Sequence, residues 1–281
     1  MSDGKENRYQ KFSVLMSVYY KEVPVFFYDA VNSVFENTIP PDDVVIVVDG
    51  PIPEGITDVI LALREKYELN IVYLSENVGL GRALNIGINY CKYNIIMRMD
   101  TDDYCINTRF QEQLDFFSTH SDVVLLGGDI AEFDTELSNF IGVRHVAYTC
   151  QSIRDMAKKR NPFNHMTVAF KKDIILSVGG YKHHPFMEDY NLWLRVIAKG
   201  HKVANLPKVM VNVRAGESML SRRKGIRYIY SEYVLYKLKL SLGIDSLVHG
   251  FFIFLMRAFI RVIPIGMISI LYSSIRKNMN T

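Results

Sequence analysis

The sequence predicts an α/β fold in which helices cover both faces of a buried sheet. Five short, almost continuously apolar runs occupy the first half of the chain, and such runs are typical of strands buried on both faces. Helical patterns separate these runs, and this alternation is typical of nucleotide-binding α/β domains. The chain has 281 residues, 49% of them hydrophobic, which suits one large domain with or without an appendage and excludes a disordered chain or a small disulfide scaffold.

The predicted elements follow in order along the chain. Strands are predicted at residues 11–18, 44–49, 71–74, 95–99 and 123–127, and helices at 23–36, 57–67, 81–91 and 107–120. Pro24 stands near the start of the first helix, where proline is tolerated, and Thr57 can cap the second helix. Beyond residue 140, helices are predicted at 151–160, 172–178 and 189–199, and strands at 203–206 and 209–214, around Pro207. No linker interrupts residues 1–217, so these are predicted to form one domain.

Cysteine and charge distribution give further expectations. Cys91, Cys105 and Cys150 are widely spaced and form no CxxC pair, which argues against a zinc site or a disulfide framework and fits a reducing cytoplasm. Residues 1–11 have no apolar core and do not resemble a signal peptide. Residues 1–217 carry a net charge of −5, whereas residues 218–281 carry +8. This asymmetry suggests an anionic partner, either a membrane or a nucleic acid.

Residues 218–281 are predicted to form a basic, amphipathic helical tail. Two apolar runs, 247–256 and 262–275, are divided by Arg257 and Arg261, and neither reaches the roughly 18–20 uncharged residues of a spanning helix. A basic, tyrosine-rich segment, 221–240, precedes them, and this combination suits a membrane interface. The alternative is a hydrophobic hairpin that packs on the body of the protein. The long apolar runs fit a soluble nucleic-acid binder poorly, so no nucleic-acid partner is expected.

The strongest chemical pattern is a cluster of carboxylates that follows the fourth predicted strand. Asp100, Asp102 and Asp103 lie where an α/β sheet binds its ligands, at the carboxyl end of a strand. Carboxylates crowded there repel one another, and Mg²⁺ or Mn²⁺ relieves the repulsion while bridging to a substrate diphosphate. The alternative is an acidic turn that caps the helix near residue 107.

Two further patterns accompany this cluster near the predicted carboxyl edge. Asp49 ends the second strand and can accept hydrogen bonds from a base or a ribose, although a turn residue is the simpler interpretation. Residues 76–85 form a glycine-containing turn into a helix whose first turn carries Arg82, an arrangement that suits a diphosphate. The glycine spacing is not that of a P-loop.

A fourth pattern opens a later helix. Glu188 and Asp189 stand at its start, where the helix dipole favours a negative charge, and such a carboxylate can serve as general base toward a sugar hydroxyl. Just upstream, Gly180 allows a backbone to approach a sugar closely. The alternative is an ordinary capped helix.

Taken in order, these motifs resemble those of the family 2 glycosyltransferases. The resemblance covers residues 12 to about 215, and it is greatest to bacterial enzymes that build O-antigen, capsule or exopolysaccharide. It implies a GT-A fold, a Rossmann-like nucleotide-binding mixed sheet flanked by helices. The matching segments are a first strand at 13–19, the strand-ending Asp49, N-x-G-x-x-x-A-x-N-x-G at 77–87, D-x-D-D at 100–103, G-G-Y at 179–181 and E-D-Y-x-L-W-x-R at 188–195.

The resemblance implies roles on the side of the nucleotide sugar. Asp49 contacts the uracil of a UDP-sugar, and Tyr19 and Glu22 line the same pocket. Arg82 holds the nucleotide. The remaining roles fall on the acidic cluster, with Asp100 facing the ribose and donor sugar, Asp102 binding the divalent cation and Asp103 supporting the turn and the sugar.

The resemblance also implies roles on the substrate side. Asp189 is the general base, with Glu188 beside it at the donor sugar, and Trp193 and Arg195 brace this helix. His165 lies in a segment, 161–165, that resembles one near the active site of bacterial members. Arg222 falls where many members carry basic residues on a loop near the diphosphate, although a solvated or membrane-facing basic patch is an equal interpretation.

These roles imply an inverting hexosyltransferase that adds a single sugar. The sequence contains neither a Q-x-x-R-W block nor a set of spanning helices, which argues against a processive synthase. The acceptor is expected to be a saccharide linked to undecaprenyl diphosphate, at the cytoplasmic face of the inner membrane. Three alternatives remain. The first is a nucleotidyltransferase, although the sequence lacks the glycine-rich phosphate loop that such an enzyme needs near its first strand. The others are a catalytically silent scaffold and a nucleic-acid-binding protein that uses the basic tail.

Overall fold

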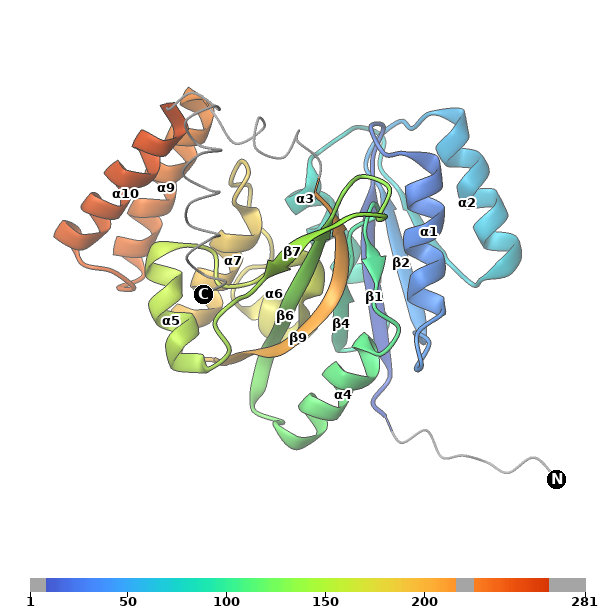
Figure 1. Cartoon of the computed structure of the whole chain (residues 1–281), viewed down its shortest axis with the longest axis horizontal. Coiled ribbons are helices and arrows are strands. Elements are labelled where there is room, and N and C mark those ends of the chain that lie inside the picture. The colour runs from blue at the N-terminus through green and yellow to red at the C-terminus, as the bar shows by residue number, and fades with distance from the viewer. Residues whose placement is uncertain (1–8, 216–224, 263–281) are drawn as a thin grey trace.

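The computed structural model describes residues 9–215 and 225–262, which fold around a nine-stranded mixed sheet (Figure 1). The strand order is β3-β2-β1-β4-β8-β6-β9-β5, and β7 pairs with β6. Strands β1 to β4 are parallel, β8 is antiparallel to β4 and β6, and β6 and β9 are parallel. The strands are β1 (Phe12–Val18), β2 (Asp43–Val48), β3 (Asn70–Tyr73), β4 (Ile95–Arg98), β5 (Tyr104–Cys105), β6 (Val123–Phe133), β7 (Phe140–Arg144), β8 (Ala169–Lys171) and β9 (Lys202–Arg214).

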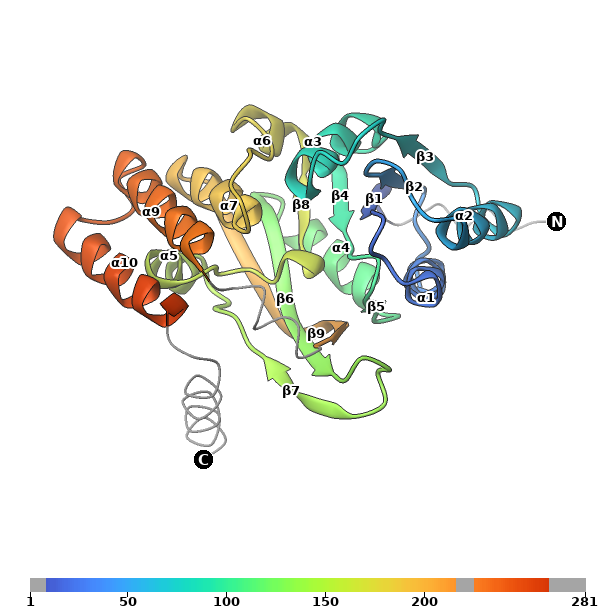
Figure 2. The same ribbon diagram turned by 90° about the horizontal axis from the view of Figure 1, so that it is seen from above.

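Helices cover both faces of the sheet, as Figure 2 shows from above. One buried cluster joins the sheet to α1, α2 and α4, and a second joins the opposite face to α3, α5, α6, α7 and α9. The helices are α1 (Pro24–Phe35), α2 (Glu54–Lys66), α3 (Leu80–Tyr90), α4 (Arg109–Thr119), α5 (Cys150–Lys159), α6 (Lys172–Ser177), α7 (Glu188–Ala198), α9 (Ile226–Ser241) and α10 (Leu247–Val262), with a 3₁₀ turn at His165–Thr167. The predicted mixed sheet flanked by helices is therefore confirmed.

The structure corrects several details of the prediction. A single strand, β9, replaces the two predicted around Pro207, because the register against β6 shifts there and accommodates the missing N–H. Thr57 lies inside α2 rather than at its cap, since the helix already begins at Glu54. Strands β5, β7 and β8 were not predicted, and β5 and β8 have only two and three residues.

The C-terminal part of the described chain is a helical hairpin. Helices α9 and α10 pack against each other, and Arg257 and Arg261 of α10 form ion pairs with Glu232 of α9. These arginines therefore lie within one continuous helix instead of dividing two runs. Helix α9 contributes Tyr228 and Leu235 to the core that surrounds α7. The predicted boundary at residue 217 and most of the second apolar run, 262–275, lie outside the described residues.

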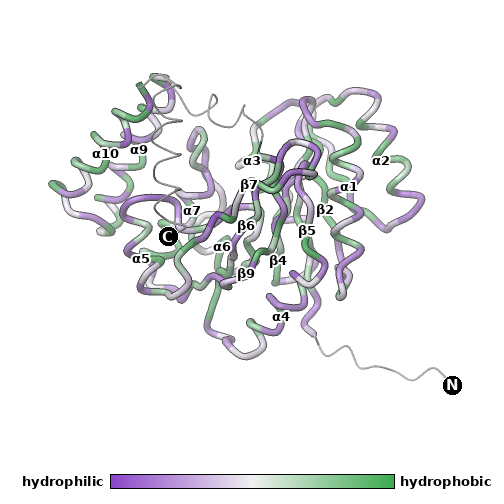
Figure 3. The backbone as a smooth tube through the Cα atoms, viewed as in Figure 1, coloured by the Kyte–Doolittle hydropathy of each residue, from purple (hydrophilic) through white to green (hydrophobic). Residues whose placement is uncertain are grey.

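The outer side of α10 is apolar and exposed. Val248, Phe252 and Phe259 are 77%, 65% and 66% exposed, and Figure 3 shows hydrophobic stretches along α10 at the end of the molecule farthest from α2. No helix among residues 9–215 and 225–262 has the length and apolar character needed to cross a membrane.

Candidate active site

The acidic turn, residues 100–103, leaves the carboxyl end of β4. Because β1, β2 and β4 are parallel, the residues that follow them lie at the same edge of the sheet. One carboxylate oxygen each from Asp100, Asp102 and Asp103 lies within 4.8 Å of the others. The structure therefore brings together the three acids that the sequence singled out.

Two arginines that the motifs did not mark hold the acidic turn. Arg98 is 2% exposed and forms an ion pair with Asp100. Arg214 donates from Nη1 to the Asp102 carbonyl (2.6 Å), and its backbone N–H donates to Asp103 Oδ1 (3.1 Å). A charged residue inside a buried strand is rarely unpaired, which was the available signal for Arg98. Arg214 gave no such signal, because 111 residues separate it from Asp103.

Crowding raises the proton affinity of the acidic turn. The Asp102 residue as a whole is exposed, but nearby protein atoms shield its carboxylate from water. This desolvation, together with the charges of Asp100 and Glu22, raises the pKa of Asp102 to about 7. Burial and the charge of Asp102 hold the pKa of Asp103 well above its usual value. A divalent cation relieves this repulsion, and carboxylate oxygens are the donors that Mg²⁺ and Mn²⁺ prefer. The residues present therefore fit the predicted cation.

Tyr19 and Glu22 follow β1. Glu22 Oε2 accepts a hydrogen bond from the Thr101 hydroxyl (2.5 Å), so Glu22 is attached to the acidic turn. Burial and the charge of Asp100 raise the pKa of Glu22. Tyr19 packs edge-on against Tyr20, with 5.6 Å between the ring centroids. Of these two residues predicted for the nucleotide pocket, Glu22 touches the acidic turn directly.

Asp49 fixes the turn before α3. It is 3% exposed, and its two carboxylate oxygens accept hydrogen bonds from the backbone N–H groups of Val78 (2.7 Å) and Gly79 (3.0 Å). At Gly50 (φ +84°), a Cβ would lie 2.5 Å from the Asn77 backbone nitrogen, so glycine is required. Asp49 thus has the turn-forming role that the sequence left open, and each oxygen keeps a lone pair for another donor.

Helices α3 and α7 bring two of the motifs into contact. At Gly81 an added Cβ would lie 2.9 Å from Glu188 Cβ, so this close approach depends on glycine. Arg82 is exposed in the same helical turn. Because the turn before α3 is held by Asp49 at the carboxyl edge of the sheet, the contact at Gly81 places Glu188 at the same edge as the acidic turn.

The acid pair, Glu188 and Asp189, forms the first turn of α7. Burial and the charge of Asp189 raise the pKa of Glu188 to about 7. Burial also raises the pKa of Asp189, against two hydrogen bonds that favour its charged form. These come from Asn161 Nδ2 to Oδ2 (2.6 Å) and from the Tyr190 N–H to Oδ1 (2.7 Å). Burial therefore opposes the helix dipole, which favours the ionised form of both carboxylates.

Trp193 and Arg195 attach α7 to the core and to the preceding turn. Trp193 is fully buried, and Arg195 donates hydrogen bonds to the carbonyls of Val178 and Gly180. His165 Nε2 lies 2.8 Å from the Tyr181 hydroxyl, and its ring packs edge-on against Trp193. Burial and the charge of Arg98 lower the pKa of His165 well below its usual value, so the imidazole is neutral. Arg222 lies outside the described residues.

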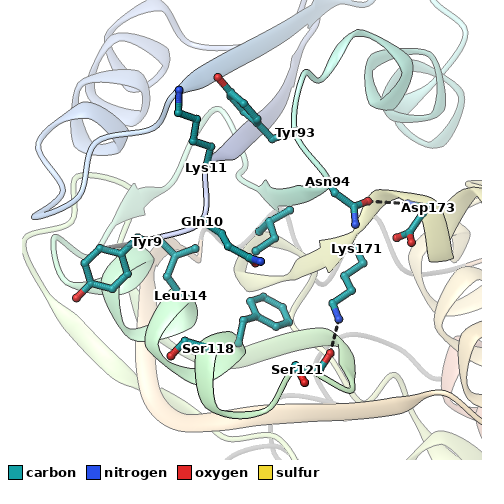
Figure 4. A pocket seen from close by; sticks show the side chains of 12 residues that line it. Tyr9, Gln10, Lys11, Tyr93, Asn94, Leu114, Ser118, Ser121, Lys171 and Asp173 are labelled. Carbon is teal, nitrogen blue, oxygen red and sulfur yellow. Dashed lines mark hydrogen bonds between the residues drawn. The ribbon is translucent and has the colours of Figure 1, made fainter. Parts of the chain in front are cut away.

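A separate pocket lies at the amino-terminal ends of β1 and β4, away from the acidic turn (Figure 4). Its volume is about 630 Å³. Its two lysines already have neighbours, since Lys171 donates to the Ser121 carbonyl and Lys11 lies over the Tyr93 ring. Asp173 is the one acid among its lining residues, whereas the acidic turn lies at the carboxyl edge.

Comparison with known sequences agrees with this geometry. The family model "Glycosyl transferase family 2" matches residues 13–174. The amylovoran biosynthesis glycosyltransferase AmsE of Erwinia amylovora is 42% identical over 266 residues, which are 95% of this chain and 99% of that protein. An Escherichia coli UDP-Gal:alpha-D-GlcNAc-diphosphoundecaprenol beta-1,3-galactosyltransferase is 35% identical over 269 residues, covering 94% of this chain and 96% of that protein.

Solved structures show the same fold. Residues 1–349 of Staphylococcus aureus TarS in complex with UDP-GlcNAc superpose with a TM-score of 0.69 at 18% identity, covering 89% of this chain and 73% of that one. A mannosyltransferase from Pyrobaculum calidifontis, in complex with GDP-Man and Mn²⁺, gives a TM-score of 0.63 at 15% identity, covering 90% and 70%. At these identities the likeness establishes the fold.

Proposed function

The chain belongs to glycosyl transferase family 2, and on that basis we propose that it transfers a single sugar from a UDP-sugar to a lipid-linked saccharide, with inversion at the transferred carbon. Relatives named for amylovoran and O-antigen biosynthesis support a place in the assembly of a bacterial surface polysaccharide. The observation that carries the proposal is that the acidic turn after β4 and the acid pair of α7, which contacts α3 at Gly81, lie at the same carboxyl edge of the sheet.

Asp189 is the proposed general base. A sugar hydroxyl has a pKa far above 7, so it must lose its proton as it attacks the donor sugar. The hydrogen bonds from Asn161 and Tyr190 stabilise the ionised carboxylate that takes up this proton. Attack opposite the leaving group converts an α-linked donor into a β-glycoside in one displacement, which needs no covalent enzyme nucleophile.

The acidic turn serves the departing nucleotide. When bound, Mg²⁺ or Mn²⁺ supplies positive charge that stabilises the leaving diphosphate. Asp102 is the principal proposed ligand, since Asp100 and Asp103 already engage Arg98 and the backbone of Arg214. Arg82, exposed in the first turn of α3, is the proposed source of a further positive charge for the phosphates.

The proposed acceptor is carried by a membrane. The E. coli relative is named for a diphosphoundecaprenol-linked acceptor. The exposed apolar side of α10 and the +8 charge of residues 218–281 complement an anionic leaflet, so we assign α10 to the cytoplasmic membrane surface. Contact with that surface gives the active site access to a lipid-linked sugar and to soluble UDP-sugar at once.

Calorimetric titration tests the donor assignment. UDP, with GDP and ADP for comparison, is titrated into the protein with and without Mn²⁺, and then into Asp102→Ala. We expect selective, metal-dependent UDP binding that Asp102→Ala weakens at least about tenfold, a loss of about 1.4 kcal/mol. Asp58→Ala, an exposed acid on α2, is the matched control and should bind like the parent. A folded parent protein that binds no UDP, or prefers GDP, contradicts the UDP assignment.

A further inference from the structure

The turn that leads into α7 is held in an unfavourable backbone conformation. We call residues 184–187 the entry turn. Phe186 has φ +65°, which is rare for a bulky side chain, and it lies two residues before Glu188 and three before Asp189. Such strain persists only where the surrounding structure imposes it, and it is common at functional sites.

Helix α7 provides no cap of its own to fix this geometry. Met187 is the N-cap residue, and no side chain there accepts a hydrogen bond from the first turn. The Asp189 carboxylate accepts from the adjacent Tyr190 N–H and from Asn161. Besides Asn161 and the contact of Glu188 with Gly81, the direction of the acid pair therefore depends on what holds the entry turn from outside.

Helix α9 supplies these restraints. Ser231, which is fully buried, donates from Oγ to the Pro185 carbonyl (2.7 Å). His184 is 2% exposed, and its Nε2 lies 2.9 Å from the Ser231 carbonyl. Since a carbonyl only accepts, Nε2 carries the hydrogen, and Nδ1 accepts from Asn191 Nδ2 on α7 (3.1 Å). One neutral imidazole therefore bridges α9 to α7.

Aromatic contacts reinforce the same connection. The Phe186 ring is stacked on Tyr228 of α9, with centroids 5.0 Å apart and planes inclined by 13°. Arg261 of α10 lies over the other partner in this stack, 4.2 Å from the centroid of Tyr228. Farther along α9, Lys239 Nζ lies over the ring of Tyr190, the residue after Asp189 (5.0 Å). The hairpin thus contacts α7 on both sides of the acid pair.

We propose that helix α9 orients the acid pair for catalysis through the entry turn, with His184 and Ser231 as positioning residues. The inference rests on the proposed function, in which Asp189 is the base, and extends it by making the C-terminal hairpin part of the catalytic apparatus. A base displaced by about 1 Å loses much of its effect, whereas Asp102, the proposed metal ligand, is held by Arg214 and not by α9.

The test compares turnover with UDP binding in single variants. In His184→Ala we expect kcat to fall about tenfold, equivalent to about 1.4 kcal/mol in the barrier, with the Kd for UDP, which lacks the donor sugar, within about twofold of the parent. His184→Gln keeps an amide donor that can reach the Ser231 carbonyl and should recover part of kcat. The matched control is His183→Ala, because His183 is the exposed neighbour of His184 and should leave both constants unchanged.

Two further variants separate the possible failures. Ser231→Ala removes only the hydrogen bond to Pro185 and should lower kcat in the same direction, so it decides the matter if His184→Ala does not fold. Normal kcat in folded His184→Ala and Ser231→Ala, beside an inactive Asp189→Asn, overturns the positioning inference alone. Normal kcat in Asp189→Asn instead overturns the proposed base, while UDP binding still reports on the donor site.

Discussion

At the scale of single residues, Asn161 sets how readily Asp189 gives up its proton. Its amide donates to Asp189 Oδ2 and lowers the pKa of that carboxyl, against the effect of burial. In Asn161→Ala this pKa rises, so activity that is present above the pKa is lost earlier as the pH falls. We expect the acidic limb of the pH–kcat profile to move up by about one unit.

The control for this prediction is another asparagine–aspartate pair far from the site. Asn139 donates to Asp134 in the connection between β6 and β7, and Asn139→Ala should leave the profile unchanged. An acidic limb that stays in place in Asn161→Ala would show that Asp189 does not limit the reaction as its base.

Residue patterns identified the acids but missed the groups that organise them. Asp100, Asp102 and Asp103 stand out because three carboxylates follow a buried strand. The partners Arg98 and Arg214 come from an adjacent apolar run and from β9, and their contacts exist only in the folded sheet. Local spacing therefore predicts where the carboxylates gather, and tertiary contacts decide which arginines pair with them.

At the scale of elements, the turn from α6 toward α7 depends on Gly180. Its φ is +57°, and an added Cβ would lie 2.0 Å from Asn85 Oδ1 of α3. Gly180→Ala combines a strained backbone with this clash, so we expect the free energy of unfolding to fall by about 2–3 kcal/mol. Denaturant unfolding, followed by circular dichroism, measures the change.

Gly142 on β7 is the matched control. An added Cβ there has no neighbour within 4 Å, and Gly142→Ala should stay within about 0.5 kcal/mol of the parent. Equal stability of the two variants would mean that α3 gives way at Asn85, and that the close approach is not required.

Elements with strong local patterns were predictable, and short ones were not. Strands β1 to β4 and β6, together with helices α1 to α7, follow apolar runs and helical periodicity. Strands β5 and β8 are stabilised by neighbours from distant parts of the chain, β9 for the first and β4 and β6 for the second. Neither has enough residues to show a pattern of its own.

At the scale of the whole molecule, α10 is the predicted contact with the membrane. Phe252 and Phe259 lie seven residues apart on its exposed side, and burying a phenylalanine contributes about 2 kcal/mol. Replacing both with glutamate should lower the fraction that sediments with anionic vesicles at least about tenfold, and added salt should weaken the parent's binding. Turnover with a water-soluble acceptor should stay unchanged.

Leu61→Glu serves as the control, because Leu61 is 54% exposed on α2, at the opposite end of the molecule. It should sediment like the parent protein. Undiminished sedimentation of the double variant would show that the exposed apolar side of α10 does not bind the membrane.

The sequence by itself determined the alternation of strands and helices, the acids at the carboxyl edge and the family, because apolar periodicity and short motifs are local properties. Only the tertiary structure decided that Asp49 holds the turn before α3, that Arg98 and Arg214 contact the acidic turn, and that α9 contacts the entry turn of α7. These contacts join residues up to 112 positions apart. Which residues meet depends on how the strands pair and how the helices cover the two faces of the sheet, and no local sequence pattern contains that information.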